Sequence, residues 1–228
     1  MGVSARVDSV RAGLARLADP EKAPGMQAYM KSAMPYRGVQ SRALRALLAE
    51  VMEVHPFAGR TDWEATLDAL WEHARYREER YAAVNLAGGR SARPWQDPAA
   101  VARYDHWVVT GAWWDHVDAV GIHRIGPILR SHRPDMTPMV RAWIGDADQW
   151  RRRVSIICQV GAKAETDLDL LGDAIVANVA DRDFFIRKAI GWALREHAKP
   201  DPDWVRAFVA THHAELSPLS YREATKRL

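Results

Sequence analysis

The order of apolar and polar residues along the chain predicts an almost entirely helical protein. In nearly every segment, apolar side chains recur at intervals of three and four residues, the spacing that gathers them on one face of an α-helix. Strict alternation of apolar and polar residues, which would indicate half-buried strands, is almost absent. The pattern therefore predicts an all-α fold.

Helix ends are predicted from prolines, glycines and capping residues. Ser41 is expected to cap one helix, and Thr61 another, with Glu64 completing a capping box. A loop is expected over 89–98, which follows paired glycines and contains two prolines. The predicted helices are 3–17, 26–34, 41–54, 61–71, 75–86, 99–109, 114–129, 138–145, 148–160, 167–180, 183–198, 201–211 and 221–228.

The predicted helices also repeat. Aligning Asp148 with Asp183 places Trp150 on Phe185, and a basic helix follows each of these aromatic residues. The aromatic position recurs at spacings of 38, 36 and 35 residues, at Tyr76, Trp114, Trp150 and Phe185. Helix pairs with such a period are typical of an α-solenoid of HEAT-like repeats. We therefore expect a single repeat domain over 1–228, with N-terminal helices over 1–36 and repeats from about 40 to 228.

Composition narrows the class further. The chain has 228 residues, 48% of them hydrophobic, which excludes a mainly disordered protein. No apolar run approaches the roughly 18 residues of a membrane span, and the first residues lack the apolar block of a secretory signal. The single cysteine, Cys158, excludes an internal disulfide framework and favours a reducing, cytoplasmic location.

Charge and repeat alignment together indicate a binding surface. The net charge is only +3, which by itself says little about partners. The alignment, however, places a set of charged and aromatic residues on or near one concave surface: Arg80, Asp118, Arg153, Lys188, Trp192 and Arg195. A basic groove with indoles and a carboxylate suits a nucleic-acid backbone and a stacking partner. The alternative is a protein-binding groove with solvated arginines.

The stretch WWDHVD, residues 113–118, carries the candidate chemistry. Trp114 and Asp118 stand four residues apart, so a helix places both on one face. Large apolar rings normally lie in the core, so the plain alternative makes Trp114 a core residue and Asp118 a solvated neighbour. Asp115 points away from Trp114 and is interpreted as a structural or helix N-terminal charge.

Several stretches resemble one known family. They are PEKAPGMQAYMKSAMPYRGV, GAWWDHVDAV, QWRRRVSI, FFIRKAIGWALREHAK and LSPLSYREATKRL, and they span the chain from residue 20 to its end. The sequence is similar to the DNA alkylation repair family of HEAT-like-repeat DNA glycosylases, the AlkD-like proteins. The resemblance implies a curved stack of helix pairs that cradles duplex DNA.

The resemblance also implies roles for individual residues. Family members excise N3- or N7-alkylated purines, which carry positive charge. The implied catalytic acid is Asp118, the implied indoles are Trp114 and Trp192, and the phosphate-gripping arginine is Arg153. Further DNA contacts are expected at Tyr29, Ser41, Arg45, Lys188 and Arg195. Residues 34–37, the pair Arg151-Arg152 and the loop 89–98 depart from the family pattern.

The sequence thus predicts a monomeric, monofunctional DNA glycosylase that acts on duplex DNA carrying alkylated purines. It needs no cofactor and no metal: His116 and His123 share a helix, but no further ligands accompany them. The alternative is a non-catalytic HEAT-repeat protein that binds damaged, branched or bent DNA, and a third is a protein-binding scaffold. The joint presence of Asp118, both indoles and Arg153 favours the enzyme, since a pure binder needs only the basic groove.

Overall fold

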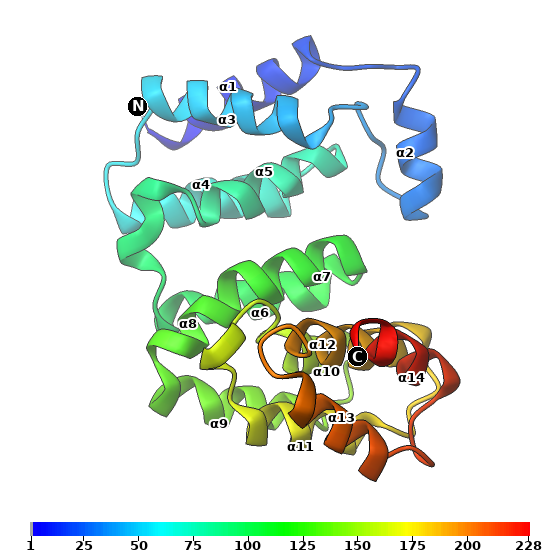
Figure 1. Cartoon of the computed structure of the whole chain (residues 1–228). Coiled ribbons are helices and arrows are strands. Elements are labelled where there is room, and N and C mark those ends of the chain that lie inside the picture. Colours follow the sequence, from blue (N-terminus) through cyan, green and yellow to red (C-terminus); the bar gives the residue numbers. More distant parts are fainter. Residues whose placement is uncertain (1) are drawn as a thin grey trace. The chain divides into compact units, whose positions relative to one another are not determined.

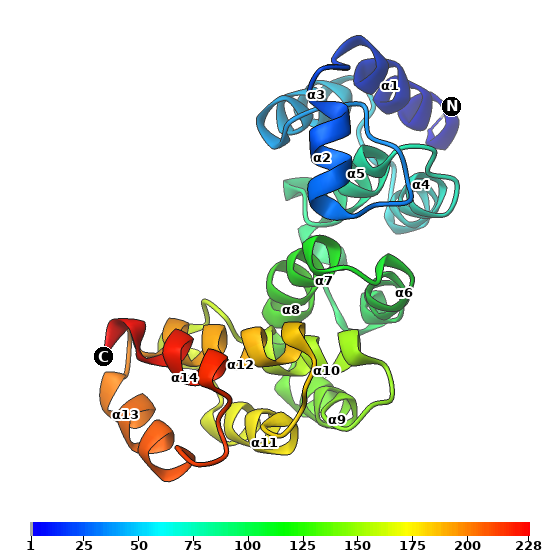
Figure 2. The same cartoon turned by 90° about the vertical axis from the view of Figure 1, so that its right-hand side faces the viewer.

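The computed structural model describes residues 2–228, and these residues form helices and connecting turns without a strand (Figures 1 and 2). The predicted all-α fold of helix pairs is confirmed. By its internal contacts the chain divides into two compact units, residues 1–96 and 97–228. The expectation of one continuous repeat domain stays a prediction. Within the described residues, no helix combines the length and apolar character that crossing a bilayer requires.

The first unit packs its helices around large apolar side chains. Trp63, Leu67 and Trp71, all from α4, are fully buried and face α1 and α5. Each lies three or four residues from another, as the apolar face of a helix requires. The elements are α1 (Val3–Arg16), α2 (Ala23–Met30), α3 (Ser41–Val54), α4 (Arg60–Glu72), α5 (Arg77–Ala87) and the 3₁₀ helix η1 (Arg90–Trp95).

Buried charges tie the first unit together. The Arg6 guanidinium is 1% exposed and binds both carboxylate oxygens of Asp62, with N–O distances of 3.2 and 2.8 Å. Glu78 is fully buried, and its carboxylate accepts the backbone N–H groups of residues 37–39. Gly38 has φ of +84°, and a Cβ there would lie 2.1 Å from the Asp19 carbonyl oxygen, so the turn before α3 requires glycine.

In the second unit, α10 lies beside both α7 and α12 (Figure 2). Helices α9 and α11 pack against α10, and α14 packs closely on α12. The elements are η2 (Pro98–Ala100), α6 (Val101–Gly111), α7 (Trp114–Val120), η3 (Gly121–Ile125), α8 (Gly126–Ser131), α9 (Arg133–Trp143), α10 (Gln149–Ile157), η4 (Lys163–Glu165), α11 (Leu168–Asn178), α12 (Phe184–His197), α13 (Pro202–Thr211), α14 (Pro218–Ala224) and η5 (Thr225–Arg227).

The predicted repeat has the same local structure in both copies. The Asp148 carboxylate accepts the N–H groups two and three residues on, at 2.7 and 3.1 Å, and so caps α10. Asp183 caps α12 with the same two bonds at the same distances. In each corner a further aspartate, Asp146 or Asp181, accepts the backbone N–H of the capping residue at 2.8 Å. The alignment of residues 148 and 183 is therefore structurally sound.

Several predicted helix boundaries are wrong. Ser41 is the first helical residue of α3 and Arg60 that of α4, and neither helix has a side-chain cap, so the capping box at Thr61 does not form. The expected loop 89–98 is mostly 3₁₀ helix. Helix α9 begins before Pro138, because Pro134 at its first turn suits a helix start. The expected helix 114–129 is interrupted by one π-turn, η3.

The π-turn lies where two backbones meet closely. A Cβ on Gly126 would stand 2.0 Å from the carbonyl oxygen of Cys158, so only glycine lets α8 approach the end of α10. Cys158 itself is fully buried, and burial raises the pKa of its thiol to about 12. Its thiol donates to the carbonyl oxygen of Ser155 at 3.7 Å.

The paired corners predict a specific loss of stability. Asp148→Ala removes both capping bonds of α10 and should lower the free energy of unfolding by about 1 kcal/mol in urea titrations. Asp148→Asn is the matched control, because an asparagine oxygen caps nearly as well and should cost much less. Equal losses in the two variants would contradict the capping role.

Candidate active site

The centre of the candidate site is an ion pair between α7 and α10. Arg153 donates from Nε to Asp118 Oδ1 at 2.7 Å and from Nη2 to Asp118 Oδ2 at 2.8 Å. The arginine side chain is 4% exposed and the aspartate side chain 16%. A planar guanidinium facing both oxygens fixes the carboxylate in position and orientation. The Asp118 carboxylate is therefore partly accessible to solvent, while the buried Arg153 guanidinium fixes its position.

A third helix completes this arrangement. The remaining Nη1 of Arg153 donates to the backbone carbonyl oxygen of Phe185 in the first turn of α12. The Phe185 ring packs on Trp113 and Trp150, with ring centroids 5.2 and 5.1 Å apart. The sequence aligned Trp114 with this aromatic position, but Trp113 is the residue that joins the cluster. One arginine thus links α7, α10 and α12.

This placement bears on the two roles considered for Arg153. The residue is 3% exposed, and three of its nitrogens already donate to protein oxygens. Such an arginine is suited to positioning Asp118. The phosphate contact that the resemblance implies stays a prediction, and it would require Arg153 to share or release the carboxylate.

Two opposing effects act on the pKa of Asp118. Burial raises the pKa of the carboxyl above its ordinary value of 3.8, and the hydrogen bonds from Arg153 oppose that rise. Asp115, one turn earlier, adds a further small rise. Burial is the largest of these effects, so the pKa of the Asp118 carboxyl is raised on balance.

The two candidate indoles lie on different helices, and both are partly exposed. Trp114 is the first residue of α7, four residues before Asp118, so the two side chains share a face. Trp192 lies in α12 and is partly buried against the core of the second unit. Neither indole is fully buried, although Trp192 packs against that core.

The cations on α12 are bound to a carboxylate that the sequence did not single out. Glu223 of α14 is 3% exposed and accepts from Lys188, at 2.9 Å, and from Arg195. Lys226 binds the same carboxylate. The two helices meet here because a Cβ on Gly191 would lie 2.5 Å from Glu223 Cβ. The expected DNA contacts Lys188 and Arg195 are therefore held in place by α14.

The remaining expected contacts belong to the first unit. Tyr29 on α2 is 72% exposed. Ser41 and Arg45 on α3 are exposed and, being four residues apart, share one face of that helix. Arg45 also lines a groove of about 990 Å³ together with Phe57 and Arg90. Arg80, by contrast, lies over the Trp71 ring, 4.7 Å from its centroid, and is half-buried.

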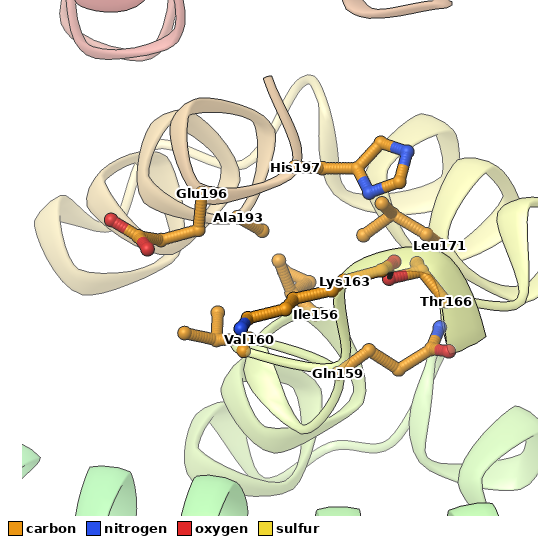
Figure 3. A pocket seen from close by; sticks show the side chains of 10 residues that line it. Ile156, Gln159, Val160, Lys163, Thr166, Leu171, Ala193, Glu196 and His197 are labelled. Carbon is orange, nitrogen blue, oxygen red and sulfur yellow. Dashed lines mark hydrogen bonds between the residues drawn. The ribbon is translucent and has the colours of Figure 1, made fainter. Parts of the chain in front are cut away.

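A small cavity beside α12 is not a base-binding pocket. It lies between the ends of α10 and α12, where His197, Leu171 and Gln159 line it (Figure 3). Its volume is about 10 Å³, room for a single water molecule and far too little for a purine. Among residues 2–228, no group of three or more His, Cys, Asp or Glu side chains is arranged to hold a metal ion.

Sequence reasoning missed the residues that position the site. Glu223 lies in the stretch 216–228 that resembles the family, close in sequence to Lys226. Its ion pairs with Lys188 and Arg195 could not be predicted, because those residues lie on another helix. The Phe185 carbonyl could not be found from side-chain chemistry at all. Spacing along one helix was informative for Trp114 and Asp118, because that relation is local.

The site thus belongs to an all-helical protein in which Arg153 holds the partly exposed Asp118 carboxylate between α7, α10 and α12. A family model described as DNA alkylation repair enzyme matches residues 10–228, and the chain belongs to that family. A solved structure described as a predicted DNA alkylation repair enzyme from Enterococcus faecalis is similar, with 31% identity and a TM-score of 0.83. The match covers 92% of this chain and 96% of that one. No curated protein matched.

The three cations around Glu223 generate a pH prediction. Hydrogen bonds from Lys226 and Lys188, with the charge of Arg195, lower the pKa of the Glu223 carboxyl from 4.5 to about 2. A lowered folded-state pKa stabilises the fold above the unfolded-state pKa, and this contribution is lost as pH falls through the folded value. Glu223→Gln should therefore cost on the order of 2 kcal/mol at neutral pH.

Urea titrations of wild type and variant at several pH values test this. The difference between them should be full above about pH 5 and should narrow as the pH falls towards 2. Glu215→Gln is the control, because Glu215 is 51% exposed beside His212 and its pairing contributes little. If the difference in free energy of unfolding between wild type and Glu223→Gln does not depend on pH, then Glu223 stabilises the fold by its packing and not by its charge.

Proposed function

We propose that this protein is a monofunctional DNA glycosylase that releases N3- or N7-alkylated purines from duplex DNA by hydrolysis of the N-glycosidic bond. Asp118 is the catalytic residue in this proposal. The observation that carries it is the pair with Arg153, which holds a largely desolvated carboxylate in one orientation and leaves its edge accessible. Membership of a DNA alkylation repair family supports the substrate class.

The chemistry follows from the charge of the lesion. An alkyl group on N3 or N7 makes the purine a cation, so the base leaves as a neutral molecule and needs no general acid. Positive charge then develops on the sugar, as in glycoside hydrolysis. A fixed carboxylate in a poorly solvated site stabilises that charge strongly, because little water screens it and no reorganisation is needed.

Pairing with Arg153 leaves Asp118 able to act. Each carboxylate oxygen can accept about two hydrogen bonds, and Arg153 uses one on each. The other positions can orient a water molecule towards the sugar carbon and accept its proton. The two hydrogen bonds from Arg153 also prevent rotation of the carboxylate, so that the oxygen lone pairs that Arg153 does not use keep a fixed direction.

The indoles supply recognition of the cation. A positive charge over an indole face gains about 0.5–2 kcal/mol, and more where water is excluded. Trp114 stands on the same face of α7 as Asp118, and Trp192 stands on α12, next to α10. Both indoles can therefore favour a charged nucleotide over a neutral one.

The non-catalytic DNA-binding alternative is less well supported. A pure binder needs cations that are available to phosphates. Here Arg153 is used internally by Asp118, and Lys188 and Arg195 share the Glu223 carboxylate. These ion pairs fix the positions of carboxylates, and they reduce the positive charge that is available to the phosphates of DNA.

Asp118→Asn should lower base release from a duplex holding one 7-methylguanine by about a hundredfold or more in single turnovers, because a neutral amide cannot match the developing charge. The variant also leaves the buried Arg153 without its carboxylate, which costs about 3–5 kcal/mol of stability. Rates are therefore compared per folded molecule, at low temperature.

Asp105→Asn is the matched control for this variant. Arg151 binds Asp105 through the same two-bond geometry, at 2.7 and 2.8 Å, between α10 and α6. Breaking that pair should reduce stability and leave base release per folded molecule near the wild-type rate. Unchanged release by folded Asp118→Asn, or an equal loss in Asp105→Asn, would remove Asp118 from its catalytic role.

Trp192→Ala should reduce the preference for cationic over neutral lesions by about two- to thirtyfold, the equivalent of one cation–π contact. The measurement compares release of 7-methylguanine with release of uncharged adducts. Trp204→Ala is the control, since Trp204 is also partly buried against the same core but lies on α13. If both variants lose stability alike and keep the wild-type preference, Trp192 is a packing residue only.

A further inference from the structure

Trp192 lies between two cations on the surface of α12. This helix is regular from Phe184 to His197. Lys188, four residues before Trp192, and Arg195, three residues after it, therefore share its side of the helix. Side chains at these spacings have Cβ atoms about 5–6 Å apart. A positively charged nucleotide over the Trp192 indole would therefore approach two positive side chains.

The same side of α12 begins at the candidate active site. Phe185 precedes Trp192 by seven residues, close to two helical turns, so the two side chains lie on one face. The Phe185 carbonyl oxygen accepts from Arg153, and the Phe185 ring centroid is 6.0 Å from Cζ of Arg153. Arg153 in turn holds Asp118. One face of α12 therefore leads from the Asp118–Arg153 pair to Trp192.

A single buried carboxylate binds both cations beside Trp192. Glu223 on α14 is 3% exposed; its Oε1 accepts from Lys188 at 2.9 Å, and its Oε2 accepts from Arg195. The approach depends on Gly191, because a Cβ there would lie 2.5 Å from Glu223 Cβ. Hydrogen bonds from Lys226 and Lys188 lower the pKa of the Glu223 carboxyl to about 2, so it is ionised at neutral pH.

This negative charge changes what the indole can bind. Repulsion between a cationic base and one unit charge at this distance is comparable with the attraction of a cation to an indole face. Two free cations beside Trp192 would therefore cancel its preference for a charged nucleotide. Glu196, four residues after Trp192, does not supply the missing negative charge, because Lys199 binds its carboxylate.

We propose that Glu223 determines the specificity of the candidate site for cationic nucleotides, by neutralising Lys188 and Arg195 on either side of Trp192. The inference rests on the proposed function for the presence of the lesion at Trp192. Glu223 need not touch the substrate, since it acts through the charges of the two cations. The same contact reduces the positive charge that these cations offer to undamaged DNA.

The test compares two duplexes that differ at one nucleotide, which carries either 7-methylguanine or guanine on a 2′-fluorinated sugar that slows base loss. Affinities of the full chain are measured by fluorescence anisotropy at low temperature and several salt concentrations. Glu223→Gln should lower the preference for the methylated duplex by about three- to tenfold, the effect of one unit charge within about 10 Å in a partly solvated site. Its affinity for the unmodified duplex should rise, with a steeper slope of log K against log salt, because two cations are released.

Lys188→Gln separates the charge of Glu223 from its packing. Added to Glu223→Gln, it removes one repelling cation and should restore much of the preference for the methylated duplex. Alone, it leaves Glu223 with less positive charge to neutralise and should raise that preference. Asp203→Asn is the matched control, because Asp203 is an exposed carboxylate that pairs with Arg206 on α13, and the preference should not change.

The outcomes separate this inference from the proposed function. Unchanged preference in Glu223→Gln, while Asp118→Asn still abolishes base release, overturns the inference alone. Equal loss of affinity for both duplexes, without rescue by Lys188→Gln, makes Glu223 a packing residue and also overturns it. The expected change in preference, with no base release by the wild type, supports the inference and contradicts the glycosylase. If Glu223→Gln does not fold, Lys188→Gln alone decides, and a preference at or below that of the wild type overturns the inference.

Discussion

The pairing of Asp118 with Arg153 joins three helices that are far apart in sequence. Removing two charges from water is costly, and their mutual attraction compensates for that only when the geometry is close to ideal. Here both oxygens are bound at 2.7 and 2.8 Å, and the third arginine nitrogen reaches the backbone of α12. The Phe185 ring, which packs on Trp113 and Trp150, has its centroid 6.0 Å from Cζ of Arg153. Because a buried pair is weak evidence for stability alone, its value lies in fixing a carboxylate in one place.

Several arginines of this chain are held in ion pairs within its two units. Arg6 is buried on Asp62, Arg151 binds Asp105, and Arg153 binds Asp118, each through two hydrogen bonds. Lys188 and Arg195 share Glu223 in the same way, though with more exposure. A basic composition therefore says little here about the positive potential available to a partner.

The sequence predicted the features that depend on local spacing. The helical period, the corners at Asp148 and Asp183, and the common face of Trp114 and Asp118 all follow from residues within two turns of one another. It failed for features of the backbone: α3 and α4 begin without side-chain caps, and the helix after Trp114 contains a π-turn. The ion-pair partners of a buried charge could not be predicted where they lie on another helix, as Lys188 and Arg195 do for Glu223. The family resemblance led to the candidate site residues, but only the structure shows that Arg153 is buried.

The position of Cys158 has a consequence for the conditions in which the protein works. Agents that alkylate purines are electrophiles, and in proteins the thiolate is the most reactive nucleophile toward them. The only thiol of this chain is fully buried, and burial raises its pKa to about 12, so almost no thiolate forms at physiological pH. Neither contact with the agent nor the reactive ionic form is available. In a member of a DNA alkylation repair family, this arrangement shields the chain's one thiol from the class of agent that damages the DNA.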